Sequence, residues 1–180
     1  MTRWTSATGK VLRLEEGDIT RVKADAIVNA ANAALAGGGG VDGAIHRAAG
    51  PSVMDELAEI RKKIGHCETG RAVVTRAGRL GALYIFHAVG PVYRGGAEGE
   101  PAQLASCYRE CLDLAAERDL KTIAFPAIST GVYGYPIDEA AEIAIREIRA
   151  FLNQPSSLAE VQIVLFGQAA LRSFETALGQ

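Results

Sequence analysis

The sequence predicts an α/β fold in which a central, largely parallel β-sheet is covered by helices on both faces. Short apolar segments alternate along the chain with segments of helical periodicity, which is typical of strand–helix–strand units with parallel strands. Two of the apolar segments lead into glycine-rich loops, each followed by the start of a helix. The chain has 180 residues, of which 48% are hydrophobic, and this is enough for the core of one domain.

The expected elements follow one another without a linker, a low-complexity segment or a clear repeat. Short apolar runs predict strands at 11–14, 26–28, 72–75, 83–89, 122–125 and 160–166. Helical periodicity predicts helices at 41–49, 52–64, 101–118, 137–151 and 169–178, with Gly50-Pro51 separating the first two.

The first glycine-rich loop carries four consecutive glycines, Gly37 to Gly40, between a predicted strand and a predicted helix. Asp42 is a suitable N-cap for that helix. Unpaired backbone N–H groups and the helix dipole both favour a phosphate at such a helix start. Because Asn32 precedes the glycines and Asp42 and His46 follow them, we expect chemistry here in addition to binding.

The second loop follows the predicted strand Ile123–Phe125 and runs from Pro126 to Pro136. It contains Ser, Thr and Gly donors and leads into a helix that begins near Ile137. Ligands of open α/β sheets bind outside the carboxyl ends of the strands, so two such loops would suit a diphosphate held between them. The alternative is that each loop is only a tight turn.

Composition excludes several classes of protein. The formal net charge of -2 argues against general nucleic-acid binding by a basic field, so any phosphate must be bound by backbone amides and dipoles. No apolar run approaches the roughly 20 residues of a membrane helix, and the N-terminus lacks the apolar core of a signal peptide. Three cysteines without framework spacing favour the cytoplasm. Cys107 and Cys111 share a helical face but do not complete a metal site, and we expect no metal.

Three common nucleotide or hydrolase motifs are weak or absent. Gly38-x-Gly40-x-x-Gly43 matches GxGxxG, but a glycine run satisfies this pattern almost automatically, and Glu56 and Glu59 lie in a helix instead of at a strand end. There is no GxxxxGK[ST] phosphate loop. Ser129 lacks the GxSxG elbow of serine hydrolases.

Four motifs together resemble the macrodomain family, specifically its bacterial MacroD-type group: residues 17–20, 29–50, 87–91 and 126–136. The resemblance covers about residues 11–178 and implies a three-layer αβα fold around a mixed, largely parallel sheet of six or seven strands. We therefore expect one macrodomain over residues 11–180, preceded by an N-terminal extension of residues 1–10. The resemblance implies hydrolysis of O-acetyl-ADP-ribose and of mono-ADP-ribosyl esters on Asp or Glu side chains of proteins, without metal, nicotinamide or other cofactor.

The resemblance also implies binding roles. Asp18 would accept a hydrogen bond from the adenine amino group beside Ile19, as a buried acceptor near a strand end, and Phe166 would pack on the adenine face. Without the resemblance, Phe166 is better explained as a core residue. The diphosphate and distal ribose would be bound by two sets of loop residues: Gly38, Gly39, Gly40 and Val41, and Ser129, Thr130, Gly131, Val132 and Tyr133.

By the same resemblance, Asn32, Asp42 and His46 form the catalytic group. Asn32 would hold a distal ribose hydroxyl, Asp42 would orient a water or a ribose hydroxyl, and His46 would steady Asp42 or the water from the same helical face. The sequence leaves open which group removes the proton, because an ordinary carboxylate is a weak base at pH 7. Singly, Asp42 is explained by an N-cap and His46 by a satisfied imidazole.

Two alternatives to the hydrolase remain at this stage. A non-catalytic ADP-ribose reader would need only the loops and the adenine pocket. An RNA-end or nucleotide-phosphate enzyme would share the pocket but turn over free phosphoesters. The segment Gly167-Gln168-Ala169 also departs from the family pattern, because many relatives carry an acidic residue there.

Overall fold

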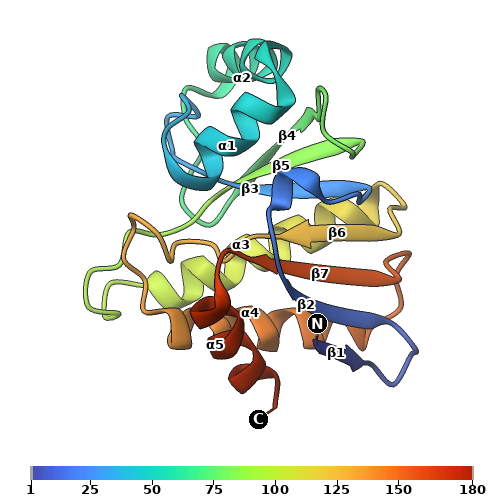
Figure 1. Cartoon of the computed structure of the whole chain (residues 1–180). Helices are drawn as coiled ribbons and strands as arrows, with labels where there is room; N and C mark the ends of the chain where they lie inside the picture. Colours follow the sequence, from blue (N-terminus) through green and yellow to red (C-terminus); the bar gives the residue numbers. More distant parts are fainter. Residues whose placement is uncertain (1, 180) are drawn as a thin grey trace.

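A computed structural model describes residues 2–179 as a seven-stranded sheet with five α-helices and one 3₁₀ helix (Figure 1). The strands are β1 (Thr2–Thr5), β2 (Val11–Glu16), β3 (Ala26–Ala31), β4 (Ala72–Arg76), β5 (Tyr84–Val89), β6 (Thr122–Phe125) and β7 (Glu160–Leu165). The helices are η1 (Ile19–Arg21), α1 (Gly40–Ala49), α2 (Pro51–Ile64), α3 (Glu100–Glu117), α4 (Ile137–Leu152) and α5 (Gln168–Leu178).

The sheet is mixed, with the strand order β1-β2-β7-β6-β3-β5-β4. The five inner strands are parallel, whereas the edge strands β1 and β4 pair antiparallel with β2 and β5. The central strands β3 and β5 are almost continuously apolar because both of their faces are covered. The predicted α/β class and the mixed, largely parallel sheet are confirmed.

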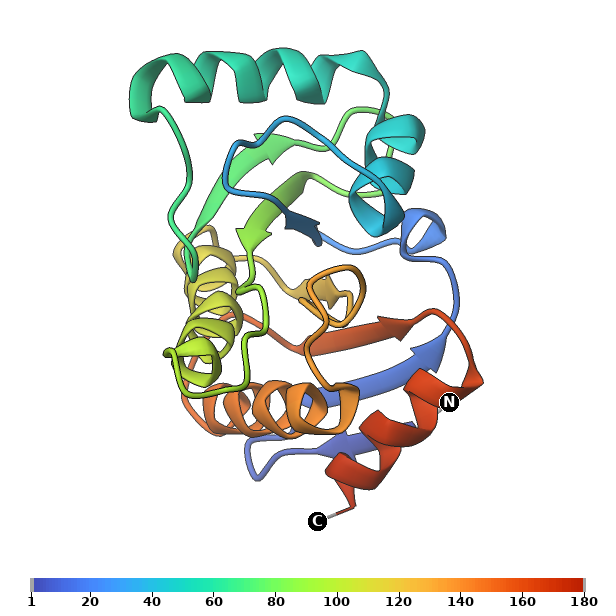
Figure 2. The same ribbon diagram turned by 90° about the vertical axis from the view of Figure 1, so that its left-hand side faces the viewer.

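Two hydrophobic clusters place the helices in layers on either side of the sheet (Figures 1 and 2). The larger cluster joins one face of the sheet to α3, α4 and α5, with Tyr108, Phe125 and Phe174 fully buried. The smaller cluster joins the other face to α1 and α2 through Ile27, Ile45 and Leu57. Cys107 and Cys111 point into the larger cluster from α3 and are fully buried there.

The predicted strand at 26–28 is three residues longer than expected. Residues 29–31 continue β3 because they pair in parallel register with residues 87–89 of β5. Asn29 interrupts the apolar run, and for that reason the sequence pattern ended the strand one residue before it. Its side chain is nevertheless fully buried.

The first ten residues were expected to lie outside the domain, but residues 2–5 form β1 at the edge of the sheet. Trp4 packs against the larger cluster, and the Arg149 guanidinium lies 5.2 Å from its ring centroid. Thr2 also donates a hydrogen bond to Glu175 in α5. The segment was not recognised as a strand because four residues give too short a pattern.

The carboxyl ends of β3, β6, β7 and β2 lie at one end of the parallel sheet. The glycine loop and α1 follow β3, and the second loop, residues 126–136, follows β6. The ends of β7 and β2 lead into α5 and η1. All predicted site residues therefore lie at one end of the sheet. Between residues 2 and 179, no helix is long and apolar enough to cross a membrane.

Candidate active site

A buried carboxylate, Asp42, lies in the first turn of α1. Asp42 was expected to be the N-cap, which is wrong: the N-cap is Gly39, and Asp42 is the third residue of the helix. Asp42 is only 6% exposed, and the amide Nδ2 of Asn29 donates a hydrogen bond to Asp42 Oδ1 over 2.7 Å. The N-terminal end of the helix dipole also favours the negative charge. The helix begins at Gly40, one residue before the predicted bound at 41 and three before the start that an Asp42 cap implies, so the carboxylate is available for tertiary contacts.

His46 lies one helical turn after Asp42, and its Nε2 is 3.2 Å from Asp42 Oδ1. The predicted proximity of these two side chains is confirmed. The other ring nitrogen, Nδ1, is buried and has no hydrogen-bond partner among residues 2–179. Both side-chain contacts that Asp42 makes within residues 2–179 use Oδ1, so Oδ2 is the oxygen left for another group.

The glycine loop brings Asn32 to the same place. Asn32 Nδ2 donates to the carbonyl of Gly37 over 2.9 Å, and its Oδ1 accepts from the N–H of Ala36. A Cβ atom on Gly38 would lie 3.4 Å from Asp42 Oδ2 and 3.7 Å from Asn32 Nδ2. Both side chains therefore border the backbone of Gly38, which is exposed.

Two glycines allow the loop to approach α1 this closely. Gly40 has a φ of +57°, a conformation that a side chain disfavours. A Cβ atom on Gly43, one residue beyond Asp42, would lie 2.6 Å from the carbonyl oxygen of Gly38. The loop is thus held against the first turn of the helix, beside its unpaired N–H groups.

The second loop is a compact turn whose central residues face outward. Ser129 has a φ of +67°, and its carbonyl accepts from the N–H of Tyr135. Thr130 Oγ1 donates to the carbonyl of Ala127. Gly131 and Val132 are exposed at the tip. The Ser129 hydroxyl is buried and has no hydrogen-bond partner in the described chain. It is therefore available to donate a hydrogen bond to, or accept one from, a bound ligand.

The second loop is fixed to the end of β5 and to the segment that follows it. A Cβ atom on Gly90 would lie 2.2 Å from Ser129 Oγ, so only glycine permits this contact. Tyr93 N–H donates to the carbonyl of Tyr133, and the Tyr93 ring packs on Tyr135 with 4.8 Å between centroids.

The third group of predicted residues lies at the ends of β2 and β7. Asp18 is exposed, so the expected buried acceptor is wrong; its Oδ1 accepts from Thr20 Oγ1 and N, and these bonds lower the pKa of the carboxyl group. Ile19 beside it is buried. Phe166 is 89% exposed, which excludes the alternative of a core residue.

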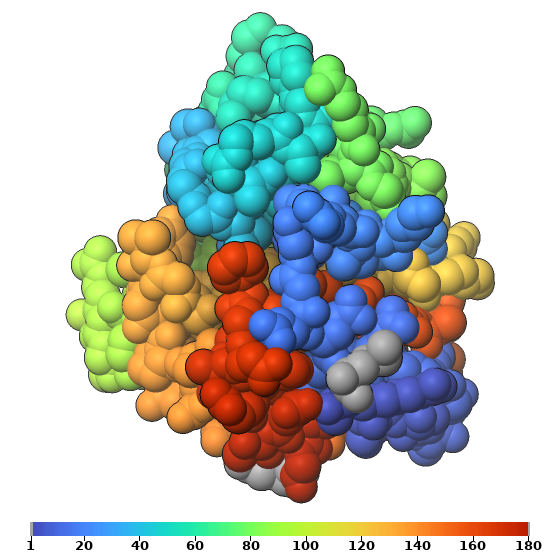
Figure 3. Space-filling view, in the orientation of Figure 1, coloured from blue at the N-terminus to red at the C-terminus, as the bar shows by residue number. Residues whose placement is uncertain are grey.

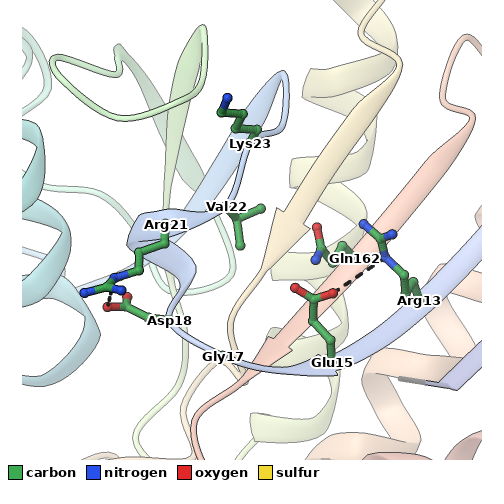
Figure 4. A pocket seen from close by; sticks show the side chains of 8 residues that line it. All are labelled: Arg13, Glu15, Gly17, Asp18, Arg21, Val22, Lys23 and Gln162. Atoms are coloured by element: carbon green, nitrogen blue, oxygen red, sulfur yellow. Dashed lines mark ion pairs between the residues drawn. The ribbon is translucent and has the colours of Figure 1, made fainter.

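A polar groove lies beside Asp18 on the face of the sheet that α1 and α2 leave uncovered (Figure 4). Glu15 and Gln162 line it from β2 and β7, and Lys23 lies on the segment that follows η1. No sequence motif pointed to Glu15, Gln162 or Lys23 as part of a site. The space-filling view also shows an indentation where the glycine-loop region, the second loop and the end of β7 meet (Figure 3).

Sequence reasoning missed two buried side chains, Asn29 and His87, as parts of the site. Asn29 Nδ2 lies 3.1 Å from His87 Nδ1, and His87 Nε2 lies 2.9 Å from Thr75 Oγ1. Desolvation lowers the pKa of His87 to about 3, helped by the nearby His46. The sequence did contain a signal for them, because each is a polar residue within an apolar strand. A buried polar side chain needs a hydrogen-bond partner, so two such residues indicate a polar contact inside the sheet.

The structure therefore brings Asn32, Asp42 and His46 together at the glycine loop. It places the second loop, Asp18 and Phe166 on other strand ends of the same sheet. Among residues 2–179, no group of three or more His, Cys, Asp or Glu residues could hold a metal ion. The arrangement offers backbone N–H groups for an anion and one free carboxylate oxygen for a water or hydroxyl.

Comparisons with known proteins show similarity in both sequence and fold. The model of the Macro domain family matches residues 28–144. A protein of Salmonella newport (strain SL254) named O-acetyl-ADP-ribose deacetylase is 51% identical over 169 residues, covering 94% of each chain. The solved Oceanobacillus iheyensis macrodomain with ADP superimposes with a TM-score of 0.94 at 40% identity, covering 99% of this chain and 94% of that one. The Trypanosoma brucei macrodomain in complex with ADP-ribose gives a TM-score of 0.84 at 41% identity, covering 93% of this chain and 69% of that one.

Proposed function

Because this chain belongs to the macro domain family, we propose that it binds ADP-ribose and hydrolyses esters of ADP-ribose. The proposed substrates are O-acetyl-ADP-ribose and proteins that carry mono-ADP-ribose on Asp or Glu side chains. The 51% identical relative named O-acetyl-ADP-ribose deacetylase supports the first substrate. The observation that carries the proposal is the convergence of Asn32 and Asp42, with its partner His46, on the glycine loop.

The diphosphate would bind between the two loops, at the backbone of Gly38–Val41 and of Ser129–Tyr133. The first turn of α1 supplies unpaired N–H groups, and helix dipoles favour an anion there. The buried Ser129 hydroxyl without a partner supports a polar ligand beside the second loop. With a net charge of -2, the chain depends on these local dipoles instead of a basic surface.

The adenine would bind at the ends of β2 and β7. The Phe166 ring is 89% exposed and is therefore free to stack on a base, while the Asp18 carboxylate can accept a hydrogen bond from an amino group. Ile19 supplies the neighbouring apolar surface. Gln168, in the segment that follows Phe166, donates to Glu16 Oε2 over 2.8 Å.

In the proposed reaction, Asp42 Oδ2 accepts a hydrogen bond from the attacking water, while Oδ1 is held by Asn29 and His46. The water oxygen adds to the ester carbonyl carbon, the acyl–oxygen bond breaks, and the ribose oxygen takes a proton. The products are a carboxylic acid and ADP-ribose. Positioning of the water and stabilisation of the developing oxyanion supply most of the rate, with the diphosphate of the substrate as a further acceptor.

The competing function is that of an ADP-ribose reader without turnover. A reader requires the two loops and the adenine site, but it has no need for a carboxylate at position 42 whose second oxygen borders the exposed loop. The position of Asp42 Oδ2 beside Gly38 therefore favours the hydrolase.

The test measures release of ADP-ribose from O-acetyl-ADP-ribose and from a glutamate-linked mono-ADP-ribosylated protein. We expect wild-type turnover on both, and a loss of about 100- to 10,000-fold in kcat for Asp42→Ala. Calorimetry should show that Asp42→Ala retains ADP-ribose affinity within about threefold, equal to about 0.7 kcal/mol. Asp55→Ala, which removes an exposed carboxylate from α2, is the matched control and should behave as wild type.

Binding of ADP-ribose without turnover of either ester would establish the reader instead. Turnover of the acetyl ester alone would contradict the protein substrate. Loss of affinity in proportion to loss of rate in Asp42→Ala would make Asp42 a binding residue.

A further inference from the structure

Three fully or almost fully buried polar side chains form a row across the sheet behind Asp42. Asn29 in β3 stands directly opposite His87 in β5, and Thr75 lies in β4 next to β5. Asn29 and His87 are 0% exposed and Thr75 is 2% exposed. The proposed reaction uses none of these residues directly, although polar groups at such depth are costly unless they are fully paired.

The hydrogen positions along this row follow from the acceptor at its far end. Thr75 Oγ1 donates its only proton to the carbonyl of Arg76, over 2.8 Å. The 2.9 Å contact with His87 Nε2 therefore requires Nε2 to carry the proton and donate it. The neutral ring then has a lone pair on Nδ1. Burial agrees with this, since it lowers the pKa of His87 to about 3.

The lone pair on His87 Nδ1 determines the orientation of the Asn29 amide. Nδ2 of Asn29 donates one hydrogen to His87 Nδ1, over 3.1 Å, and the other to Asp42 Oδ1, over 2.7 Å. A flipped amide would place the oxygen of Asn29 against the carboxylate oxygen and the Nδ1 lone pair, which are both acceptors. One amide orientation thus satisfies both neighbours.

We propose that His87, with its proton fixed by Thr75, is a positioning residue for ester hydrolysis that acts through Asn29 on Asp42. The proposal rests on the proposed hydrolase function. By keeping Asn29 Nδ2 on Asp42 Oδ1, the row leaves Asp42 Oδ2 directed at the glycine loop, where the attacking water is to be oriented. His87 itself is fully buried and does not touch the substrate.

The experiment compares variants that preserve or remove the acceptor at the Nδ1 position of residue 87. The side-chain oxygen in His87→Asn can occupy that position, whereas His87→Gln places its amide near the Nε2 position and leaves a carbon beside Asn29. Thr75→Val keeps the shape of the side chain but removes the acceptor for Nε2–H. We expect kcat to fall about 10- to 100-fold in His87→Gln and Thr75→Val, with KM and ADP-ribose affinity unchanged. His87→Asn should recover kcat to within about fivefold of wild type, because it restores the acceptor.

Circular dichroism melting of each variant separates positioning from general destabilisation. Equal losses of kcat in His87→Asn and His87→Gln, or a rise in KM in step with the loss of kcat, would overturn the positioning role. A fully active Thr75→Val would show that Thr75 is not needed to fix the proton on His87 Nε2, which would overturn that step of the proposal. Because Thr75→Val is close to isosteric, it keeps the test valid if a His87 variant fails to fold. A wild-type protein without turnover contradicts the hydrolase itself, whereas an active wild type with an active His87→Gln contradicts only the inference.

Discussion

The catalytic end and the adenine end of the proposed ADP-ribose site are built in opposite ways. At the α1 end, Asp42 is buried and held by Asn29 and His46, and Asn29 in turn contacts His87 inside the sheet. At the other end, Phe166 is 89% exposed, and the exposed Asp18 contacts only side chains of the following turn, Thr20 and Arg21, among the described residues. Chemistry requires a fixed oxygen, whereas a flat base can be recognised by an exposed ring that adjusts on binding.

The difference has a physical origin in the sheet. The α1 end lies beside β3, a central strand covered on both faces, where an unpaired polar group costs about 1 to 3 kcal/mol. The acceptors Asp42 Oδ1 and His87 Nδ1 therefore favour one orientation of the Asn29 amide, with Nδ2 toward both. The other end follows β2 and β7, in the half of the sheet that α1 and α2 leave open, and no such penalty selects a single conformation there.

The largest expected effect comes from replacing the aspartate at each end by asparagine. Asp42→Asn keeps the shape but removes the charge beside the attacking water, so kcat should fall about 100- to 10,000-fold while ADP-ribose affinity is retained. Asp18→Asn keeps an acceptor for Thr20 and should change affinity by less than about tenfold, with kcat unchanged. Steady-state kinetics and calorimetry on both variants check this. Equal effects at the two ends would abolish the distinction.

The next effect tests the close packing of the glycine loop on α1. A Cβ atom on Gly43 would lie 2.6 Å from the Gly38 carbonyl, so Gly43→Ala should lower the free energy of unfolding by about 1 to 3 kcal/mol. Gly39 has a φ of -94° and open space around its Cβ position, so Gly39→Ala should cost less than about 1 kcal/mol. Urea denaturation of the two variants gives the comparison. If Gly39→Ala is the more destabilised variant, the close packing has been assigned to the wrong glycine.

A third prediction concerns the exposed end alone. Phe166→Ala removes the ring proposed to stack on adenine and should weaken ADP-ribose binding by about 1 to 3 kcal/mol, raising KM at constant kcat. Leu83→Ala is the control, because Leu83 is also an exposed apolar side chain, at 57%, but directly precedes β5, away from the carboxyl ends of the parallel strands. The stability of both variants should stay within about 0.5 kcal/mol of wild type. A loss of kcat in Phe166→Ala would extend the chemistry to this end.

The last prediction concerns the buried end and how the free energy of unfolding depends on pH. Its effect is the smallest of the four at neutral pH and grows as the pH falls. Burial lowers the pKa of His87 to about 3 from an ordinary 6.5, so below pH 6.5 the unfolded chain binds a proton that the folded chain does not. The stability derived from a neutral His87 is complete above pH 6.5 and is lost as the pH falls toward 3. His87→Asn removes this dependence, and its stability deficit should shrink by about 2 kcal/mol between pH 7 and pH 5.

The exposed His66 provides the control for this measurement, with His66→Asn expected to follow the wild-type curve. Chemical denaturation at each pH gives the free energies of unfolding. If the free energies of unfolding of wild type and His87→Asn change in parallel with pH, His87 takes up a proton in the folded chain as readily as in the unfolded one. The hydrogen-bond directions assigned to Asn29, which need a neutral His87, would then be wrong.

The sequence predicted eleven of the helices and strands in order, together with their class, because apolar periodicity and glycine or proline boundaries are local signals. It failed at β1, which has only four residues, and at the carboxyl end of β3, where Asn29 resembled a strand terminus. It also misassigned the start of α1, since Asp42 is a good cap by type but Gly39 occupies that position. In each case a tertiary contact prevailed over a local preference.

The sequence by itself determined the α/β class, the two glycine-rich loops at strand ends, and the presence of Asn32, Asp42 and His46 around the first of them. The tertiary structure alone decided which oxygen of Asp42 remains free, that Phe166 is exposed, and that Asn29, His87 and Thr75 support the site. The physical reason is that these features depend on strand register and sheet order. Asn29 and His87 are 58 residues apart and become neighbours only when β3 pairs with β5.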